Sequence, residues 1–224
     1  MKWSEYSRNA ANHLWEASLS HPFVREIADG TLPIEAFAHY IRNDALYLRT
    51  FAQVQRMGAA KADAQLGARL RAHAANTDDA ERALHQTFFS MLDIAPPDAQ
   101  ALPAPTAYRY MSHLITVASL GTVAEVVAAI LPCYWLYWEI GLHYRDARPE
   151  HPVYQRWVAT YGSAWYGELV REQLERADNL AAAASIEEQQ KMTRHFLLSS
   201  QYELEFWTMA YDLETWRFEE CETQ

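Results

Sequence analysis

The sequence predicts an all-α protein, a single-domain helical bundle that extends over residues 1–224. Apolar residues recur at steps of three and four along most of the chain, and no stretch alternates long enough to indicate a β-strand. With 50% hydrophobic and 21% charged residues, the composition is that of a globular protein with a large core. Glycines and prolines mostly fall between the helical patterns. We expect about eight to eleven helices.

Proline and glycine mark the predicted helices of the first half. Pro22 opens a short helix that Gly30 ends, and a long helix is predicted over residues 33–61, opened by a proline. A second long helix is expected over residues 63–92, with "NTDD" as a possible break. The proline-rich segment "APPDAQALPAP" is predicted to be a loop.

Capping residues mark the helices of the second half. A helix over residues 106–120 is followed by "TVAE", which has the pattern of a capping box and begins a helix that "RPEHP" ends. "SIEE" is a second capping box. Further helices are expected from Val153, Ser163 and Ser185, and a short acidic tail begins at about residue 214.

Charge and cysteine content restrict the partners and the compartment. The net charge of −10 argues against a basic face that binds nucleic acid. The uncharged run between Glu125 and Glu139 contains 13 residues, which is too short for a membrane span, and Pro132 interrupts it. Cys133 and Cys221 lie far apart in different settings, so no disulfide framework or metal spacing follows. We expect a cytoplasmic protein.

The helix that begins near Pro33 carries a carboxylate on an aromatic face. Burial of an unpaired carboxylate is costly, so Asp44 needs a partner or a ligand, and a structural aspartate is the alternative. Glu35, Arg42, Asn43 and Arg49 are expected on the other sides of this helix. Steps of three and four place five residues on the inward face: Phe37, Tyr40, Asp44, Tyr47 and Phe51.

The last predicted helix repeats this pattern. Glu203 is the only charge on its inward stripe, whereas Glu205 lies on a different face and is expected to be solvated. A second inward carboxylate favours a functional site, although such stripes are usually core. The other members of the stripe are Met192, Phe196, Ser199, Phe206 and Ala210.

The segment "LPCYWLYWEIG" combines a proline, a cysteine and four aromatic rings. Pro132 falls well inside its helix, where proline removes a backbone hydrogen bond and usually produces a kink. Cys133 follows directly. Free cysteine is among the most buried residue types, so these residues alone favour a core cysteine over a nucleophile.

Five separated segments give the chain a family resemblance. In order they are "HPFVREIADGTLP", "IRNDALYLRTFAQVQ", "LPCYWLYWEIG", "HPVYQRWVATYGS" and "SSQYELEFWTMAY". Together they resemble the cysteine-containing branch of the TenA-type thiaminase II family, over about residues 3–213. The resemblance implies a bundle with the haem oxygenase-like (TenA) fold, assembled as a homotetramer. It implies removal of ammonia or of the thiazole from the methylene carbon of a 4-amino-2-methylpyrimidine, in thiamine salvage.

The resemblance also implies which residues are catalytic. The family nucleophile, in "LPCYW", corresponds to Cys133, and the family acid, in "YELEFW", corresponds to Glu203. Tyr47 and Tyr110 match two further family tyrosines, and we expect one of them to stabilise the thiolate by a hydrogen bond. Burial is expected to raise the pKa of Glu203 toward the working pH, so that it can protonate a ring nitrogen. The implied reaction needs no metal and no cofactor.

Four further matches are expected to bind the pyrimidine. Asp44 would accept a hydrogen bond from the exocyclic amine, while Tyr137, Tyr161 and Phe206 would surround the flat ring. The chain departs from the family pattern at Leu46, where relatives often carry an aromatic residue. Whether this change alters the shape of the pocket is left open by the sequence, and the chemistry stays in place.

Three other classes of protein are compatible with a helical bundle. A haem or quinone-cofactor enzyme would require ligands, and nothing singles out His113 or His143 for that role. A di-iron bundle uses Glu-x-x-His motifs, and no glutamate here has a histidine three residues later. A regulatory protein would bind the aminopyrimidine or thiamine without turnover, and only an activity assay separates it from an enzyme.

Overall fold

The structure is a computed structural model that describes residues 1–98 and 100–218, apart from the side chains of residues 78, 80–82, 84 and 85. This part of the chain contains ten helices and no strand, as the sequence predicted. Cys221 and most of the acidic tail lie outside the described residues. The helices are α1 (Trp3–Ala10), α2 (Asn12–Leu19), α3 (Pro22–Asp29), α4 (Ile34–Lys61), α5 (Ala64–Leu92), α6 (Pro105–Leu120), α7 (Val123–His143), α8 (Pro152–Tyr161), α9 (Ala164–Ala183) and α10 (Ile186–Tyr211).

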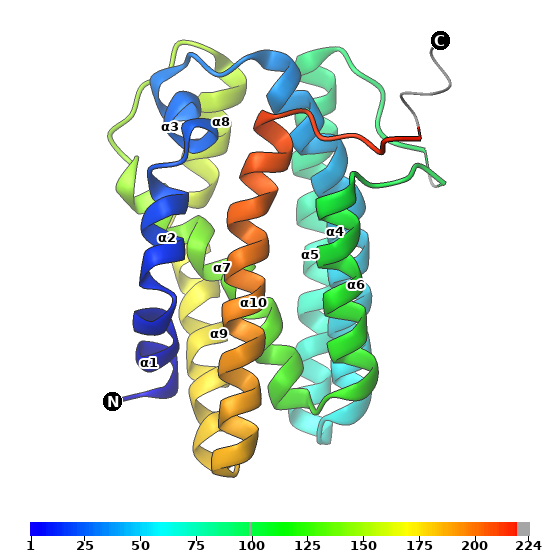
Figure 1. The fold of residues 1–224 in the computed structure, drawn as a ribbon, viewed down its shortest axis with the longest axis vertical. Helices are drawn as coiled ribbons and strands as arrows, with labels where there is room; N and C mark the ends of the chain where they lie inside the picture. The colour runs from blue at the N-terminus through cyan, green and yellow to red at the C-terminus, as the bar shows by residue number, and fades with distance from the viewer. Residues whose placement is uncertain (99, 219–224) are drawn as a thin grey trace.

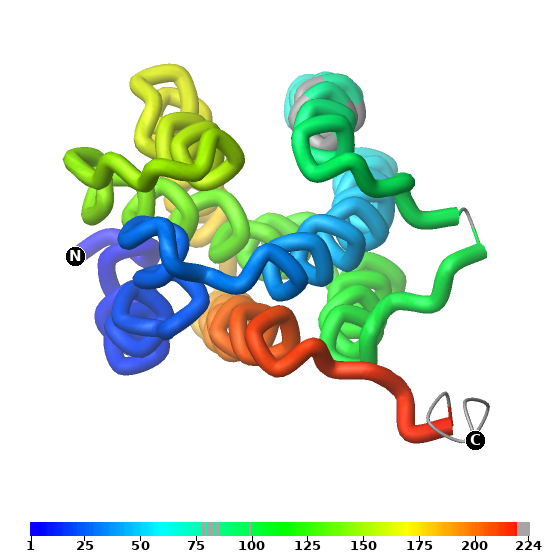
Figure 2. The backbone as a smooth tube through the Cα atoms, turned by 90° about the horizontal axis from the view of Figure 1, so that it is seen from above, coloured from blue at the N-terminus to red at the C-terminus, as the bar shows by residue number. Residues whose placement is uncertain are grey.

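The long helices form a bundle around α7, which runs obliquely behind α10 (Figure 1). Viewed from above, α4 and α10 lie side by side at the centre, with α1 and α2 to one side and α5 and α6 to the other (Figure 2). Helix α7 packs against α10, α9, α6, α4 and α8. Its first half, from Ala124 to Pro132, is entirely buried, so the helix that carries Cys133 is central in the bundle.

Helix α7 is the one helix of the described chain that is long and apolar enough to cross a membrane. Of its most apolar 18-residue window, 72% is buried inside the protein. Core helices of soluble proteins commonly have the same length and composition, so this finding is weak evidence for a membrane span.

Most predicted helix boundaries are confirmed by their capping geometry. Gly30 ends α3 with a φ of 78°, in the left-handed region that favours glycine. The Thr122 hydroxyl accepts from the Glu125 backbone N–H at 3.2 Å, and the Glu125 carboxylate accepts from the Thr122 N–H, so the predicted capping box begins α7. Ser163 and Ser185 likewise cap α9 and α10.

The possible break at "NTDD" does not occur, and α7 ends earlier than predicted. Helix α5 continues from Ala64 to Leu92 through "NTDD", because residues with low helix propensity are tolerated when the flanking turns pack against a neighbour. Helix α7 ends at His143, before "RPEHP". Asn43, which was placed off the inward stripe of α4, is also buried, at 5% exposure; its side chain accepts from the Ala104 backbone N–H at 2.8 Å and donates to the His39 carbonyl.

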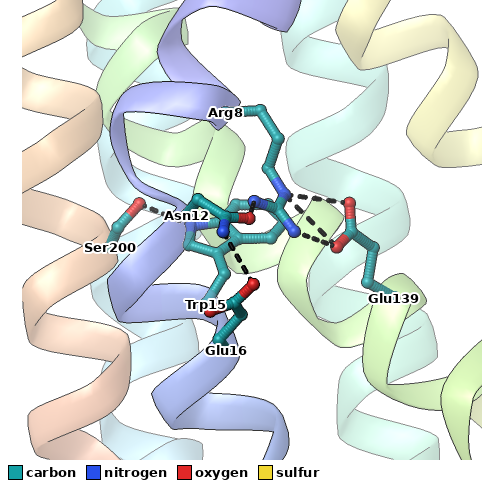
Figure 3. Close-up of polar contacts among 6 residues, drawn as sticks. All are labelled: Arg8, Asn12, Trp15, Glu16, Glu139 and Ser200. Atoms are coloured by element: carbon teal, nitrogen blue, oxygen red, sulfur yellow. Dashed lines mark hydrogen bonds and ion pairs between the residues drawn. The ribbon is translucent and has the colours of Figure 1, made fainter.

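The N-terminal helices are joined to the core by a polar contact (Figure 3). The Arg8 guanidinium lies 4.3 Å from the centre of the Trp15 ring and donates to Glu139 of α7, with the shortest distance 2.7 Å. The Trp15 indole N–H donates to the Ser200 hydroxyl of α10 at 3.0 Å. These contacts hold α1 and α2 against α7 and α10.

Candidate active site

The predicted site residues come from five helices and lie in the protein core. Helix α4 carries Asp44 and Tyr47, α6 carries Tyr110, α7 carries Cys133 and Tyr137, α8 carries Tyr161, and α10 carries Glu203 and Phe206. All are buried except Cys133, which is half-buried, and none is more than 6% exposed apart from that cysteine. The contacts below show that these side chains form one cluster.

Glu203 is the carboxyl group at the centre of the cluster. It is 2% exposed, and its Oε1 accepts a hydrogen bond of 2.7 Å from the Tyr110 hydroxyl. Burial raises the pKa of Glu203 to about 8; the Tyr110 hydrogen bond opposes this shift, and the negative charge of Asp44 adds to it. Glu203 therefore holds a proton at neutral pH, as a general acid must.

Two tyrosines lie close to both this acid and the thiol. The rings of Tyr47 and Tyr110 are 4.9 Å apart. Burial raises the pKa of Tyr47 well above its ordinary value, and Cys133 is the largest of the neighbouring charges that add to this shift. The Tyr47 hydroxyl is buried and lies near the Tyr110 hydroxyl, which is close enough to influence its pKa. It is a neutral donor available to a ligand or to the thiolate.

Tyr110 was the alternative to Tyr47 as the donor to the Cys133 thiolate, but in the structure it contacts the acid. Its hydroxyl donates to Glu203, so its proton is engaged by the acid. The sequence could not show this contact, because it depends on how α6 and α10 are placed against each other.

Aromatic side chains surround the two carboxyl groups. The rings of Tyr137 and Tyr161 are 4.7 Å apart, and Phe206 lies 5.9 Å from Tyr47. Asp44 is 6% exposed and close enough to Glu203 and Tyr137 for its charge to raise the pKa of both. The cluster thus combines a flat apolar lining with a few polar groups, which is the usual composition of a small-molecule site.

Two further residues of this cluster were not predicted. The Tyr40 and Tyr137 hydroxyls are 3.2 Å apart, and the Tyr137 ring lies 5.1 Å from Trp207. Tyr40 was placed on the inward stripe of its helix, one turn before Asp44, and that position was the available signal. The buried Trp207 indole N–H has no hydrogen-bond partner in the described chain.

Comparison with known proteins identifies the family of the chain. The model of the TENA/THI-4/PQQC family matches residues 8–213. The chain belongs to this family. Among its relatives, the aminopyrimidine aminohydrolase of Bacillus subtilis is 47% identical over 218 residues, covering 96% of this chain and 92% of that protein. The aminopyrimidine aminohydrolase of Halalkalibacterium halodurans is 34% identical, covering 93% and 95% of the two chains.

Solved structures show the same fold. The TenA homologue of P. horikoshii OT3 superposes with a TM-score of 0.88 at 27% identity and covers 95% of this chain and 99% of that one. A haem oxygenase-like domain from Shewanella denitrificans has a TM-score of 0.73 at 12% identity, over 95% and 93% of the chains, which shows the fold alone. The predicted fold class and family are confirmed.

A cavity of 510 Å³ lies next to this cluster of site residues. Tyr161 and Tyr134, the residue after Cys133, line it together with Trp165 and Glu168. Neither Cys133 nor Glu203 lines this cavity, so the cavity is adjacent to the predicted catalytic residues and does not contain them. Within the described residues, no group of three or more His, Cys, Asp or Glu side chains is arranged to hold a metal ion.

Proposed function

We propose that the protein is an aminopyrimidine hydrolase that removes the amine from 4-amino-5-aminomethyl-2-methylpyrimidine and releases the hydroxymethylpyrimidine and ammonia. The observation that carries the proposal is Glu203, a buried carboxyl group with a pKa of about 8 that faces Tyr110 in an aromatic cluster with Asp44 and Tyr47. The 47% identity to an aminopyrimidine aminohydrolase over most of both chains supports it.

Glu203 and Cys133 carry the successive steps of the hydrolysis. Glu203 donates its proton to a ring nitrogen, and the Cys133 sulfur forms a bond to the ring carbon, which interrupts the aromaticity. The bond between the methylene carbon and nitrogen then breaks, and the amine takes the proton released by the Cys133 thiol and leaves as ammonia. The oxygen of a water molecule bonds to the methylene carbon, and its hydroxyl stays on the product. The carbon–sulfur bond breaks, the other water proton returns to the sulfur, and the ring proton returns to Glu203.

The other side chains orient the ring. Asp44 accepts from the exocyclic amine, and Tyr137, Tyr161 and Phe206 pack around the flat heterocycle. The Tyr47 hydroxyl donates to the sulfur, which lowers the energy of the thiolate. No step requires a metal or a cofactor.

The direct test of this function is ammonia release by purified protein, with Cys133→Ser as the first variant. An alcohol is a far weaker nucleophile than a thiol at neutral pH, so we expect turnover to fall to the background level while the fold is kept. Retention of more than about a tenth of the wild-type rate, a loss under roughly 1.4 kcal/mol, would exclude the covalent step. Cys221→Ser is the matched control and is expected to behave like wild type.

The same assay separates two alternative functions. Binding of the aminopyrimidine without ammonia release would indicate a regulatory protein. Thiamine shares the pyrimidine and differs in its leaving group, so steady-state kinetics on both substrates ranks them. We expect the aminomethylpyrimidine to give the higher kcat/KM, because the cysteine-containing branch that the chain resembles favours salvage.

The proposal includes an assembly and a compartment. A homotetramer follows from the family resemblance, and sedimentation equilibrium of the purified chain tests it. A cytoplasmic location, without nucleic-acid or membrane partners, is consistent with two widely separated cysteines and a net charge of −10. Cell fractionation tests the location.

A further inference from the structure

Tyr134 follows Cys133 directly in α7, and the proposed reaction gives it no role. It is 5% exposed, and its hydroxyl accepts a hydrogen bond from Nε2 of Gln55 on α4. Thr77 of α5 is a second hydrogen-bonding neighbour of this hydroxyl. The Tyr134 ring lies edge-on to Phe51 of α4, with the ring centres 5.3 Å apart. The side chain next to the nucleophile is therefore held by two other helices.

The backbone of α7 loses one helical hydrogen bond just before Cys133. Pro132 lies inside the helix and has no backbone N–H, so the Ala128 carbonyl loses its usual helical donor. A helix bends most easily at such a position. The place of Cys133, the next residue, therefore depends on side-chain contacts that hold the following turn, and Tyr134 makes such contacts.

Gln55 belongs to the same face of α4 as the predicted site residues. Tyr47, Phe51 and Gln55 follow one another at steps of four residues, so their side chains lie on one side of the helix. Gln55 is 1% exposed. One helix therefore carries Tyr47, the proposed donor to the thiolate, and also the side chain that holds the turn of Cys133.

A second side-chain hydrogen bond joins the same two helices. The Tyr40 hydroxyl on α4 lies 3.2 Å from the hydroxyl of Tyr137, which is about one turn after Tyr134 on α7. Along α4, Tyr40 precedes the predicted site residues and Gln55 follows them. The two contacts thus fasten α7 to α4 on both sides of the stretch of α4 that carries the site.

The sulfur of Cys133 lies close to the hydroxyls on which its reactivity depends. Burial raises the pKa of Tyr47 and of Tyr110, and the nearby charge of Cys133 adds to both shifts. A thiolate is stabilised by a donor at hydrogen-bonding distance, and attack on a ring carbon needs the reacting atoms about 3–3.5 Å apart. A small displacement of the sulfur would therefore weaken the contact with Tyr47 and the approach to the substrate.

We propose that Tyr134 and Gln55 are positioning residues for Cys133: their hydrogen bond fixes the turn after Pro132 and so holds the sulfur against Tyr47 and the substrate carbon. The inference rests on the proposed function, because Cys133 is the nucleophile of that reaction. The Tyr134 hydroxyl itself takes no part in bond formation or in proton transfer.

Kinetics of Tyr134→Phe and Gln55→Leu test the positioning role. Each variant removes one side of the hydrogen bond and keeps most of the side-chain volume. We expect kcat to fall about 10- to 100-fold because the nucleophile loses its alignment, with KM within about twofold because the groups that bind the pyrimidine stay in place. The double variant should lose no more than the larger single loss, because both changes break one interaction. Losses that multiply in the double variant would overturn the proposal, as would wild-type kcat in both single variants.

Alkylation of Cys133 tests the position of the sulfur without any turnover. The chain has two cysteines, so in a Cys221→Ser background iodoacetamide reports Cys133 alone. We expect the alkylation rate at neutral pH to fall several-fold in both variants, because a sulfur displaced from Tyr47 forms less thiolate. An unchanged or faster rate would overturn the proposal. If the wild-type protein releases no ammonia, the proposed function fails, whereas this measurement still decides whether Tyr134 and Gln55 position the thiol.

Tyr154→Phe on α8 is the matched control. Tyr154 is 2% exposed, and its hydroxyl donates to the Leu32 carbonyl at 2.7 Å, so the change removes one hydrogen bond from a similarly buried tyrosine outside the predicted site. It should leave kcat and the alkylation rate unchanged. Equal losses in Tyr154→Phe would show a general effect of a lost buried hydrogen bond and would overturn the positioning role.

Discussion

Glu203 and Glu205 are two residues apart on α10, and their surroundings are opposite. Glu203 is enclosed by aromatic rings and held by Tyr110, whereas the side chain of Glu205 is 37% exposed and lies 3.9 Å from Arg109. Desolvation disfavours the ionised form, so the buried Glu203 carboxyl group keeps its proton near neutral pH. One helix thus presents a proton donor inward and an ordinary surface carboxylate outward.

The pKa of Glu203 predicts the pH dependence of the reaction. A general acid must be protonated in the free enzyme, so kcat/KM should fall as the pH rises through about 8. Glu203→Gln should lose this limb and lower kcat by about 10²- to 10⁴-fold, because the amide cannot donate a comparable proton. pH–rate profiles of wild type, Glu203→Gln and the control Glu205→Gln measure both effects. An inactive Glu205→Gln beside an active Glu203→Gln would contradict the assignment.

Asp44 is expected to act on binding as well as on rate. Its carboxylate would hold the exocyclic amine in the ground state and in the transition state, and a hydrogen bond to a charged group contributes about 1.5–3 kcal/mol. Asp44→Asn keeps the shape and loses the charge, so KM should rise while kcat falls, with kcat/KM down about 10- to 100-fold. Initial-rate measurements decide this, and an unchanged KM would contradict the binding role.

At the scale of helices, local chemistry predicted the boundaries where a single side chain determines them. Gly30, Thr122 and Ser163 act within one turn of their own position, so their roles follow from sequence. The continuity of α5 through "NTDD" depends on packing against α4, and the surroundings of Asn43 depend on Ala104, so neither could be predicted from local sequence.

In the candidate site, too, some features could be predicted from local sequence and others depend on contacts between helices. Asp44 and Glu203 stood out because each is a charge on an apolar helical face, and the structure buries both. Cys133 was not distinguishable from a core cysteine by its own segment, and only the resemblance identified it. The Tyr110–Glu203 hydrogen bond and the Tyr40–Tyr137 contact join different helices, so periodicity within one helix could not reveal them.

The capping box of α7 gives a prediction for that helix. The Thr122 hydroxyl satisfies the Glu125 N–H and also donates to Glu188 at 2.6 Å. Thr122→Ala should lower the free energy of unfolding by about 1 kcal/mol, the usual loss for an N-cap. Urea titration measures it. Thr116→Ala, inside α6 and exposed, is the control and should be neutral or slightly stabilising, because alanine has the higher helix propensity. Equal losses would mean that the cap contributes nothing.

At the scale of the whole molecule, the buried polar groups of the site lower the free energy of unfolding. Folding places Asp44, Glu203 and several hydroxyl groups inside the bundle, where each loses its contact with water. The compact arrangement of α4, α6, α7 and α10 around them supplies the apolar contacts that offset this loss. A protein that keeps a buried proton donor for its reaction should therefore become more stable when that donor is removed.

Glu203→Gln tests this trade-off through its pH dependence. The pKa of Glu203 rises on folding from 4.5 to about 8, so between these values the unfolded chain releases a proton that the folded chain keeps. Wild-type stability therefore falls as the pH rises through this window and levels off above it, whereas glutamine does not titrate. Relative to its value at low pH, the advantage of Glu203→Gln should grow from about 1 kcal/mol at pH 5 to about 4 kcal/mol at pH 8. Urea unfolding at both pH values measures it, with Glu205→Gln as the control. A Glu203→Gln advantage that is the same at both pH values would show that Glu203 does not carry its proton in the folded protein.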